Sequence, residues 1–186
     1  MPPPWDLGHP QPAFVRLAEQ GLLTGQLLDA GCGTGEQTLL AASSGADALG
    51  ADVSPLAIER ARGKAAARGL KVRFEVADAL RLGELGQAFD TVIDSGLFHV
   101  FDDENRVRYV ASLASVLRPG GRLYLMCFSD RQPGTVGPRR VSQDELRAAF
   151  SDGWTIIAIQ PGTFEVNPGF FGTTTTQAWL ATISRV

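Results

Sequence analysis

Cysteine is scarce in this chain, and its few cysteines are not arranged for pairing or for metal binding. Only two of the 186 residues are cysteines, Cys32 and Cys127, with no C-x-x-C pair, and the two histidines are not spaced as metal ligands. The sequence therefore offers no disulfide framework and no zinc site, and we expect no metal. Unpaired thiols are typical of a reducing compartment, so a cytoplasmic protein is expected.

Concentrated positive charge is also missing. The chain has 17 Lys and Arg against 20 Asp and Glu, a formal net charge of -3, and its only adjacent basic pair is Arg139 and Arg140. Proteins that bind DNA or RNA normally present a concentrated basic face. A nucleic-acid partner or substrate is therefore not expected.

Long hydrophobic runs are absent as well. No apolar stretch is long enough to cross a bilayer, and the first residues, "MPPPWDLGHPQP", lack the positive flank and apolar centre of a secretory signal. We expect no membrane partner. What remains, 44% hydrophobic and 20% charged residues, is the balance of one folded domain. The sequence does not fix the oligomeric state and slightly favours a monomer.

Alternating strand and helix patterns run through the first two thirds of the chain. This cadence predicts βαβ units and a parallel sheet. In the last third, two strand patterns are joined only by a loop, which favours an antiparallel pair. The expected strands are 26–30, 46–53, 71–78, 88–95, 122–129, 154–160 and 173–186, and the expected helices are 10–22, 36–45, 55–68, 103–117 and 141–150. The predicted fold is an α/β, Rossmann-like, doubly wound sheet of mostly parallel strands whose last strand is reversed.

A glycine-rich loop follows the first strand in "LLDAGCGTGEQT". Gly31, Gly33 and Gly35 form G-x-G-x-G, whereas a dinucleotide site requires G-x-G-x-x-G and this chain has Glu36 at the last position. Asp29 and Glu36 would repel a diphosphate, and no Lys-Ser or Lys-Thr follows as in a P-loop. A ligand with a cationic sulfonium and an ammonium group would instead be attracted to Asp29. The loop therefore predicts S-adenosylmethionine as cofactor.

Two further carboxylates end neighbouring strands. Asp52 ends the second strand about 20 residues past the start of the loop, the spacing at which an acidic side chain reaches ribose hydroxyls. Asp78 ends the third strand, where its carboxylate could accept a hydrogen bond from an adenine amino group. Either residue alone could be an ordinary helix or turn cap. Together with Asp29 and the glycine loop, they indicate a nucleoside-binding edge of the sheet.

The segments "LLDAGCGTG", "GADVSPLAIERAR", "FEVADAL", "FDTVIDSGLFHV" and "LRPGGRLYLMCFS" together resemble the class I S-adenosylmethionine-dependent methyltransferases over about residues 25–130. This resemblance implies a seven-stranded sheet with a reversed final strand. It also implies roles for individual residues. The methionine part of the cofactor would lie against Asp29, Ala30, Gly31, Cys32, Gly33, Thr34 and Gly35, the ribose against Asp52 and Val53, the adenine against Asp78 and Ala79, and the methyl-transfer site beside Asp94 and Ser95.

A narrower resemblance lies in "PPWDLGHPQP", residues 3–12. It is similar to the Pro-Trp-Asp-x-Gly-x-Pro-x-Pro segment of the thiopurine, thiol and halide methyltransferase group and its small bacterial relatives, where it forms part of a lid over the cofactor. Trp5 is therefore a candidate cofactor contact, and we expect its indole to be buried. The implied organisation is one methyltransferase domain over 1–186, with a lid segment and helix (1–22), a cofactor-binding core (23–130) and a C-terminal helix and strand pair (131–186).

The chemistry expected is direct in-line methyl transfer to a small molecule, which needs aligned reactants rather than a metal. His99 is a candidate base for a phenol or thiol proton, and Asp94 a second candidate catalytic residue. Arg131 could orient an anionic acceptor. Each of these residues also has a plausible structural role. The aromatic residues near the predicted site could form either the acceptor pocket or ordinary core: Phe98, Phe101, Phe170 and Phe171.

The acceptor class stays open at this point. A thiol, a halide, or a phenolic or quinol hydroxyl would fit the N-terminal resemblance. Two other functions are compatible with parts of the sequence. One is a catalytically silent module that binds S-adenosylmethionine for a partner protein; the other is a nicotinamide oxidoreductase, which the missing third glycine of the dinucleotide pattern makes least favoured.

Overall fold

A single seven-stranded sheet forms the centre of the protein in the computed structural model, which describes residues 5–186. The strand order is β3-β2-β1-β4-β5-β7-β6. Strands β1 to β5 are parallel, whereas β7 runs antiparallel to both β5 and β6. The prediction of a mostly parallel sheet with a reversed last strand is confirmed. The strands are β1 (Gln26–Ala30), β2 (Asp47–Asp52), β3 (Arg73–Val76), β4 (Phe89–Ser95), β5 (Leu117–Phe128), β6 (Trp154–Glu165) and β7 (Thr175–Arg185).

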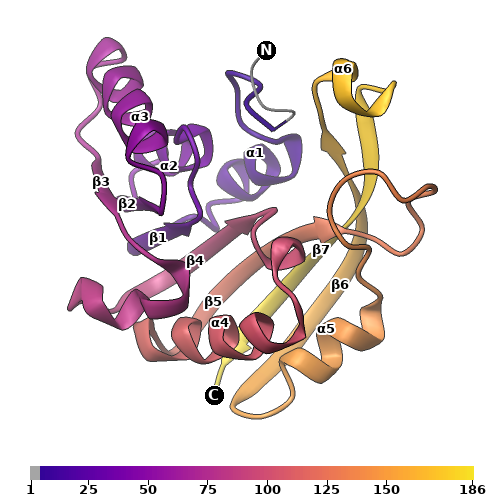
Figure 1. Ribbon diagram of the computed structural model, residues 1–186. Helices are drawn as coiled ribbons and strands as arrows, with labels where there is room; N and C mark the ends of the chain where they lie inside the picture. Colours follow the sequence, from indigo (N-terminus) through magenta and orange to yellow (C-terminus); the bar gives the residue numbers. More distant parts are fainter. Residues whose placement is uncertain (1–4) are drawn as a thin grey trace.

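Helices cover the two faces of this sheet (Figure 1). Alternate strand residues point to opposite faces. Thus Leu28 and Val92 join a core that includes residues of α4 and α5, whereas Leu27 and Ile93 join one that includes residues of α1 and α2. The helices are α1 (Pro12–Glu19), α2 (Glu36–Ser43), α3 (Pro55–Ala67), α4 (Asp103–Val116), α5 (Gln143–Ala149) and α6 (Pro168–Phe171), with short 3-10 helices η1 (Ala79–Leu85) and η2 (Phe98–Val100).

The helix boundaries follow from local capping chemistry. Ser54 accepts a hydrogen bond from the backbone N–H of Ala57 at the start of α3, with Pro55 in the first turn. Ser142 and Glu145 form a reciprocal capping box at the start of α5. Each cap satisfies backbone donors that the first helical turn leaves without an intrahelical partner.

Three predicted elements have different bounds in the structure. Strand β5 begins at Leu117, which pairs with Phe89 of β4, instead of at residue 122 after a turn. Strand β6 extends to Glu165 instead of ending near residue 160, and the connection to β7 contains the short helix α6. Pairing with β7 along almost the whole of β6 explains the longer strand, because that pairing comes from tertiary structure rather than from the local pattern. Helix α1 is shorter than the predicted 10–22.

The chain order creates a switch point at the middle of the sheet. From β1 the chain proceeds outward through β2 to β3, and then returns to β4 on the other side of β1. Open α/β sheets bind ligands in the crevice outside the carboxyl ends of strands at such a point. Here the crevice receives the glycine loop after β1 and the turn after β4. Within the described chain, no helix has the length and apolarity required to cross a membrane.

Candidate functional site

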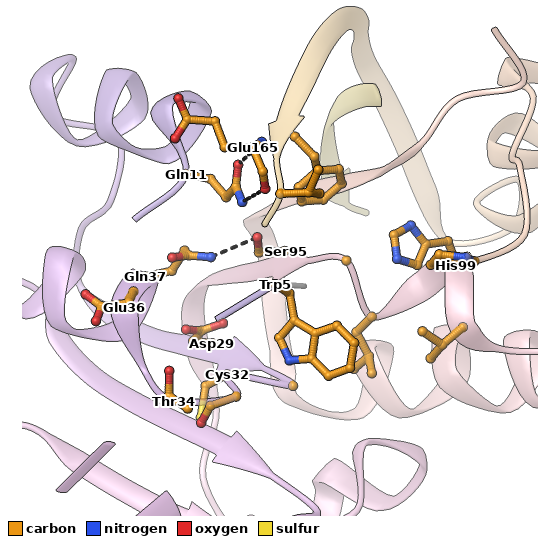
Figure 2. Close-up of a pocket in the computed structure, with 18 of the residues that line it drawn as sticks. Trp5, Gln11, Asp29, Cys32, Thr34, Glu36, Gln37, Ser95, His99 and Glu165 are labelled. Atoms are coloured by element: carbon orange, nitrogen blue, oxygen red, sulfur yellow. Dashed lines mark hydrogen bonds between the residues drawn. The ribbon is translucent and has the colours of Figure 1, made fainter. Parts of the chain in front are cut away.

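A cavity of about 560 Å³ opens at the switch point, between the glycine loop, the turn after β4 and the N-terminal segment (Figure 2). Parts of the chain that are distant in sequence therefore meet in one site: the N-terminal segment, the ends of β1, β2 and β4, the loop after β5, and the β6–α6 region. The lining residues are Trp5, His9, Gln11, Asp29, Gly31, Cys32, Gly33, Thr34, Gly35, Glu36, Gln37, Asp52, Ser95, Gly96, Leu97, His99, Val100, Phe128, Gly137, Pro138, Phe164, Glu165, Val166 and Phe171.

The three loop glycines have different physical roles. All three have positive φ angles, of 71°, 53° and 88° for Gly31, Gly33 and Gly35. A Cβ at Gly31 would lie 2.8 Å from Leu97, and one at Gly35 would lie 2.8 Å from Phe74, so both glycines permit close packing inside the protein. A Cβ at Gly33 would meet no atom within 4 Å. Gly33 therefore leaves open space that a ligand can approach.

Asp29 is a buried carboxyl at the end of β1 that also lines the cavity. Its Oδ2 accepts a hydrogen bond of 2.6 Å from the Thr38 hydroxyl on α2. Burial is the largest cause that raises the pKa of Asp29, to about 7, and the nearby Asp94 and Asp52 raise it further. A cationic ligand in the cavity would relieve the cost of ionising this group.

Asp52 fixes the geometry of the glycine loop. One carboxylate oxygen accepts the backbone N–H of Gly33 at 2.9 Å, and the other accepts the N–H of Ser54 at 2.8 Å. Asp52 thus joins the end of β2, the glycine loop and the start of α3 while it lines the cavity. Carboxylates that accept backbone N–H groups form stronger bonds than neutral acceptors.

Gln37, at the start of α2, spans the cavity between the two strand ends. Its Nε2 donates to the Ser95 hydroxyl at 2.9 Å (Figure 2). Its Oε1 is buried and has no hydrogen-bond partner among the described residues. A buried acceptor without a partner is costly, and this oxygen is not exposed to the open cavity.

Glu36 does not present a free negative charge to the cavity, contrary to the sequence-based argument that it would repel a diphosphate. It bonds Lys64 at 2.8 Å and Arg68 at 3.0 Å, both from α3, and these partners lower the pKa of its carboxyl. Of these two carboxylates, Asp29 is therefore the one that would repel a diphosphate. The sequence did not indicate this ion pairing, because Lys64 and Arg68 lie 28 and 32 residues beyond Glu36.

His99 lies in η2, after the turn that follows β4, and its ring points into the cavity (Figure 2). Nδ1 accepts a hydrogen bond of 2.9 Å from the backbone N–H of Phe128. The ring packs edge-on against Phe128, with centroids 4.9 Å apart, and lies 5.9 Å from Phe164. Burial, and then Arg140 and Arg106, lower the pKa of His99 to about 3.

Asp94 does not line the cavity, although it ends the strand that leads there. Its carboxylate is fully buried and accepts the backbone N–H groups of Leu97 and Phe98 and the hydroxyl of Tyr109. Burial raises the pKa of Asp94 to about 7. This geometry gives Asp94 a positioning role: it holds the turn that carries His99.

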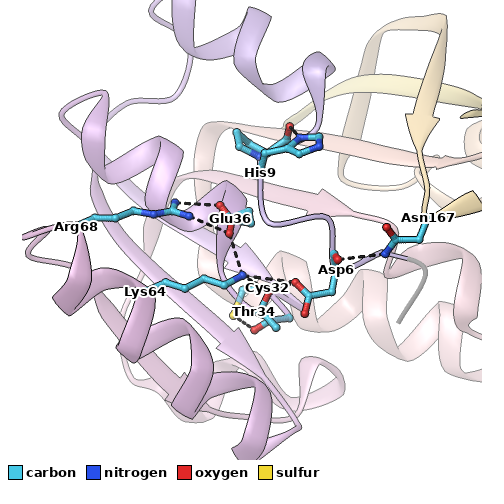
Figure 3. Close-up of polar contacts among 10 residues, drawn as sticks. Asp6, His9, Cys32, Thr34, Glu36, Lys64, Arg68 and Asn167 are labelled. Atoms are coloured by element: carbon cyan, nitrogen blue, oxygen red, sulfur yellow. Dashed lines mark hydrogen bonds and ion pairs between the residues drawn. The ribbon is translucent and has the colours of Figure 1, made fainter. Parts of the chain in front are cut away.

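The N-terminal segment contributes Trp5, His9 and Gln11 to the cavity lining. Figure 3 shows the segment between Lys64 of α3 and Asn167. The Asp6 carboxylate accepts the Thr34 hydroxyl at 2.7 Å and lies 3.5 Å from the Lys64 ammonium, while the Asp6 carbonyl accepts Asn167 Nδ2. Gln11 exchanges two hydrogen bonds with the backbone of Glu165. The segment is thus held on one side by the glycine loop and on the other by the end of β6.

Trp5 lines the cavity but is 69% exposed, so the expectation that its indole is buried is wrong. Its ring faces the cavity rather than packed protein. Pro3 and Pro4 of the same motif lie outside the described residues.

Other predicted site residues lie away from the lining. Ala30 is buried in β1, Val53 is exposed, and Asp78 caps η1 through the N–H of Leu80, with Ala79 beside it. Asp78 and Val53 remain candidates for a ligand that extends past the cavity edge toward β2 and β3.

The candidate acceptor residues divide similarly. Phe98 is fully buried, Phe101 packs on Tyr109, and Arg131 stacks on the Trp179 ring 4.6 Å away, so none of the three lines the cavity. Phe171 does line it, whereas the side chain of Phe170 lies outside the described part of the chain.

The aromatic wall of the cavity was missed by sequence reasoning. Phe128 comes from β5 and Phe164 from β6, and their ring centroids lie 5.6 Å apart. Gly137 and Pro138, from the loop after β5, line the same region. The alternating apolar pattern of a strand does not indicate which end of it borders a cavity, and the loop after β5 carries no motif.

A doubly wound sheet with a glycine loop and acidic strand ends at its switch point defines a nucleoside-cofactor protein of the methyltransferase type. A family model described as "Methyltransferase domain" matches residues 27–121. The chain is also 40% identical, over 89% of its length and 74% of the relative, to 2-heptyl-1-hydroxyquinolin-4(1H)-one methyltransferase of Mycobacteroides abscessus. It is 30% identical, over the same shares, to probable thiol methyltransferase 2 of Arabidopsis thaliana. The chain therefore belongs to the methyltransferase family.

Solved structures support the same assignment. A structure that concerns the conversion of a disulfide bond into a thioacetal group during echinomycin biosynthesis has a TM-score of 0.88 and 41% identity, covering 98% of this chain and 85% of that chain. Magnesium protoporphyrin IX methyltransferase from Synechocystis PCC 6803, solved with bound S-adenosylmethionine, has a TM-score of 0.70 and 25% identity, covering 92% and 76%. The protein is an S-adenosylmethionine-dependent methyltransferase of the small-molecule group, which removes the nicotinamide alternative and disfavours a silent module.

Proposed function

We propose that this enzyme transfers the methyl group of S-adenosylmethionine to a hydroxyl oxygen of a planar aromatic small molecule, such as a phenol, a quinol or an N-hydroxyquinolone. The observation that carries the proposal is the cavity wall formed by Phe128, Phe164 and Phe171 beside the imidazole of His99. Aromatic walls suit a flat apolar body, and one polar group fixes its orientation.

The residues present fit the cofactor. The open space at Gly33 lets a ligand lie close to the backbone, and the buried carboxyl of Asp29 suits a neighbouring cation. We assign the methionine part to Asp29 and residues 31–35, and the ribose to Asp52. When bound, S-adenosylmethionine supplies an activated methyl group on a sulfonium. The protein's part is to align the acceptor and to exclude water.

The part of the cavity around His99 and the aromatic wall, to which we assign the acceptor, is lined mainly by apolar groups. Leu97 and Val100 border it from the turn after β4, and Gly137 with Pro138 border it from the loop after β5. A Cβ at Gly137 would lie 2.6 Å from the Phe171 ring, so the loop packs directly against the aromatic wall. Such a surface favours burial of an aromatic ring system over a halide ion, which would lose its hydration without compensating charge.

The relatives bear on the reacting atom. The hydroxyquinolone methyltransferase, 40% identical, supports an oxygen acceptor. A sulfur acceptor is the second candidate, because the echinomycin-related structure concerns disulfide chemistry and the Arabidopsis relative is a probable thiol methyltransferase. The cavity favours oxygen, since a neutral imidazole N–H is a better partner for oxygen than for sulfur.

The test is transfer of isotopically labelled methyl from S-adenosylmethionine to a panel of phenols, quinols, N-hydroxyquinolones, aromatic and aliphatic thiols, and halides. Products are identified by mass spectrometry. Labelled aryl or N-alkoxy ethers support the proposal, whereas labelled thioethers or methyl halides without any ether contradict it. A Phe164→Ala variant, which opens the aromatic wall, should raise KM for the preferred aromatic acceptor and leave KM for S-adenosylmethionine near the wild-type value.

A further inference from the structure

We infer that the acceptor binds as its oxygen anion and that His99 donates a hydrogen bond from Nε2–H to the reacting oxygen, instead of removing a proton from it. This inference rests on the proposed function, since it concerns a hydroxyl acceptor in the same cavity. It reverses the role that the sequence suggested for His99 and defines the acceptor further, as a hydroxyl acidic enough to ionise in the site.

The first argument is the tautomer of the ring. The backbone N–H of Phe128 can only donate, and it points at Nδ1 of His99 over 2.9 Å. Nδ1 must therefore be the unprotonated nitrogen, and a neutral ring carries its hydrogen on Nε2. To act as a base toward a ligand, His99 would need an unprotonated Nε2. Its hydrogen would then be on Nδ1, where it would face the backbone N–H of Phe128.

The second argument is the charge around the ring. Arg106 from α4 and Arg140 from the loop before α5 are the charged groups that oppose a proton on His99. Arg106 lies over the Phe98 ring, and Arg140 lies over the Phe128 ring, against which the imidazole packs. Asp94 turns its carboxylate toward Leu97, Phe98 and Tyr109, and Glu165 lies by His9 and Gln11 across the cavity. Arg106 is paired with the Glu145 carboxylate at 3.2 Å, whereas Arg140 donates to backbone carbonyls of its own loop. Arg140 is therefore the cation that disfavours an imidazolium and favours an anionic ligand.

The third argument is the direction of Nε2. A Cβ built at Gly96 would lie 3.4 Å from it, and Gly96 lines the cavity beside Ser95. No hydrogen bond to Nε2 from the residues that the structure describes is present, so this donor is available to a ligand. The imidazole thus presents one N–H between the aromatic rings and the turn after β4.

The reaction balances without a base. The oxygen anion uses a lone pair to form the new C–O bond while the C–S bond breaks. The electron pair of the C–S bond stays on the sulfur. An anion and a sulfonium become a neutral ether and a neutral thioether, and no proton moves in the step. The acceptor's proton is lost to solvent before or on binding.

Two variants separate a donor from a base. In His99→Gln the side-chain amide reaches the Nε2 position and can donate, but it cannot titrate. In His99→Asn the amide reaches only the Nδ1 position, so it can pair with Phe128 but presents no donor to the cavity. We expect His99→Asn to lower kcat/KM about 10- to 100-fold, the effect of one hydrogen bond to a charged group, and His99→Gln to stay within a few-fold of wild type. Equal, large losses in both variants, with both still folded by thermal melting, would overturn the donor role.

A series of ring-substituted phenols with graded acidity gives the second readout. The rise of kcat/KM with pH should follow the pKa of each phenol and shift with it in the wild type and in His99→Gln. A rise fixed at one pH for all phenols, present in the wild type and abolished in both variants, would identify His99 as a base.

Equilibrium binding of 4-nitrophenol, whose anion has its own visible absorption, gives a readout without turnover. The pKa of the bound phenol should lie below that in solution for wild type and His99→Gln, and return toward the solution value in His99→Asn. An unchanged or raised pKa in the wild type would overturn the inference. If ethers do not form at all while thioethers do, the proposed function fails instead, and the two failures are distinguishable.

Discussion

Asp29 lies where a bound cation would change its ionisation. Because burial holds its pKa at about 7, the carboxyl of the free protein is largely protonated below pH 7. A sulfonium or ammonium group favours the ionised form, so binding lowers this pKa and releases a proton. Affinity for S-adenosylmethionine should therefore rise with pH up to about 7 and level off above it, by at most about tenfold per pH unit for one proton.

Calorimetry between pH 5.5 and 7.5, in buffers of different ionisation enthalpy, measures both the affinity and the released proton. Asp29→Asn keeps the size of the side chain and removes its titration, so it should bind more weakly at pH 7.5 and show a flat pH profile. An unchanged slope in Asp29→Asn would assign the proton to another group, of which Asp94 is the first to test because its pKa is also raised to about 7.

Substitutions at the loop glycines should affect cofactor binding and thermal stability separately. Gly33→Val should abolish cofactor binding, because its side chain enters open cavity space, while the fold melts near the wild-type temperature apart from the strain of a positive φ. Gly35→Val should lower the melting temperature much further, because its Cβ meets Phe74 and Ala61.

Gly69→Val controls for the strain alone, since Gly69 has a φ of 63° and open space around its Cβ position. Thermal melting and calorimetric binding on the three variants complete the comparison. Normal binding by Gly33→Val would place the cofactor elsewhere.

At the residue scale, the sequence indicated correctly that the glycine loop, Asp29 and Asp52 lie together, because one motif and its spacing place them at the ends of the first two strands. Their contacts with the cofactor stay a prediction. The hydrogen-bonding state of His99 could not be predicted, because it is set by the backbone of Phe128, 29 residues away. The pairing of Glu36 with Lys64 and Arg68 was hidden for the same reason.

Among the elements, the N-terminal segment acts as a strap whose main polar link to α3 is Lys64. Its ammonium donates to Thr34 and Glu36 and lies near Asp6, so it ties strap, glycine loop and helix together. Lys64→Met should loosen the strap while Glu36 keeps Arg68. We expect the dissociation rate of S-adenosylhomocysteine to rise about 3- to 10-fold, as for the loss of a partly exposed ionic contact.

Lys71→Met is the matched control, since Lys71 is exposed and its loss should not affect the strap. Stopped-flow displacement of the bound product measures both rates. Equal dissociation rates in the two variants would mean that the strap does not limit product release.

Elements whose ends are marked by local capping residues were predicted well. Elements whose length depends on pairing with distant parts of the chain were not. The capping residues Ser54 and Ser142 gave helix starts that the structure confirms. The length of β6 and the presence of α6 depend on pairing with β7 and on contacts with the N-terminal segment, which local propensity does not contain.

At the scale of the whole molecule, the cavity joins both halves of the sheet, so a ligand there should stabilise the entire fold. S-adenosylhomocysteine at 100 times its Kd adds about 2.7 kcal/mol to the free energy of unfolding. For a chain of this size, that corresponds to a rise of about 5–10 °C in Tm. NADH at the same concentration should leave Tm unchanged. Differential scanning fluorimetry gives the answer, and a shift with NADH alone would contradict the cofactor assignment.

The strap has a consequence for the order in which the protein matures on the ribosome. Gln11 is separated from its partner Glu165 by 154 residues, so synthesis at about 5–20 residues per second leaves it without that anchor for about 8–30 s. The core over 27–121 emerges well before the anchor. A nascent chain therefore completes the predicted cofactor-binding core first and the segment that covers it last, and the newly made enzyme passes through a stage in which this face of the sheet is open to small molecules and to chaperones.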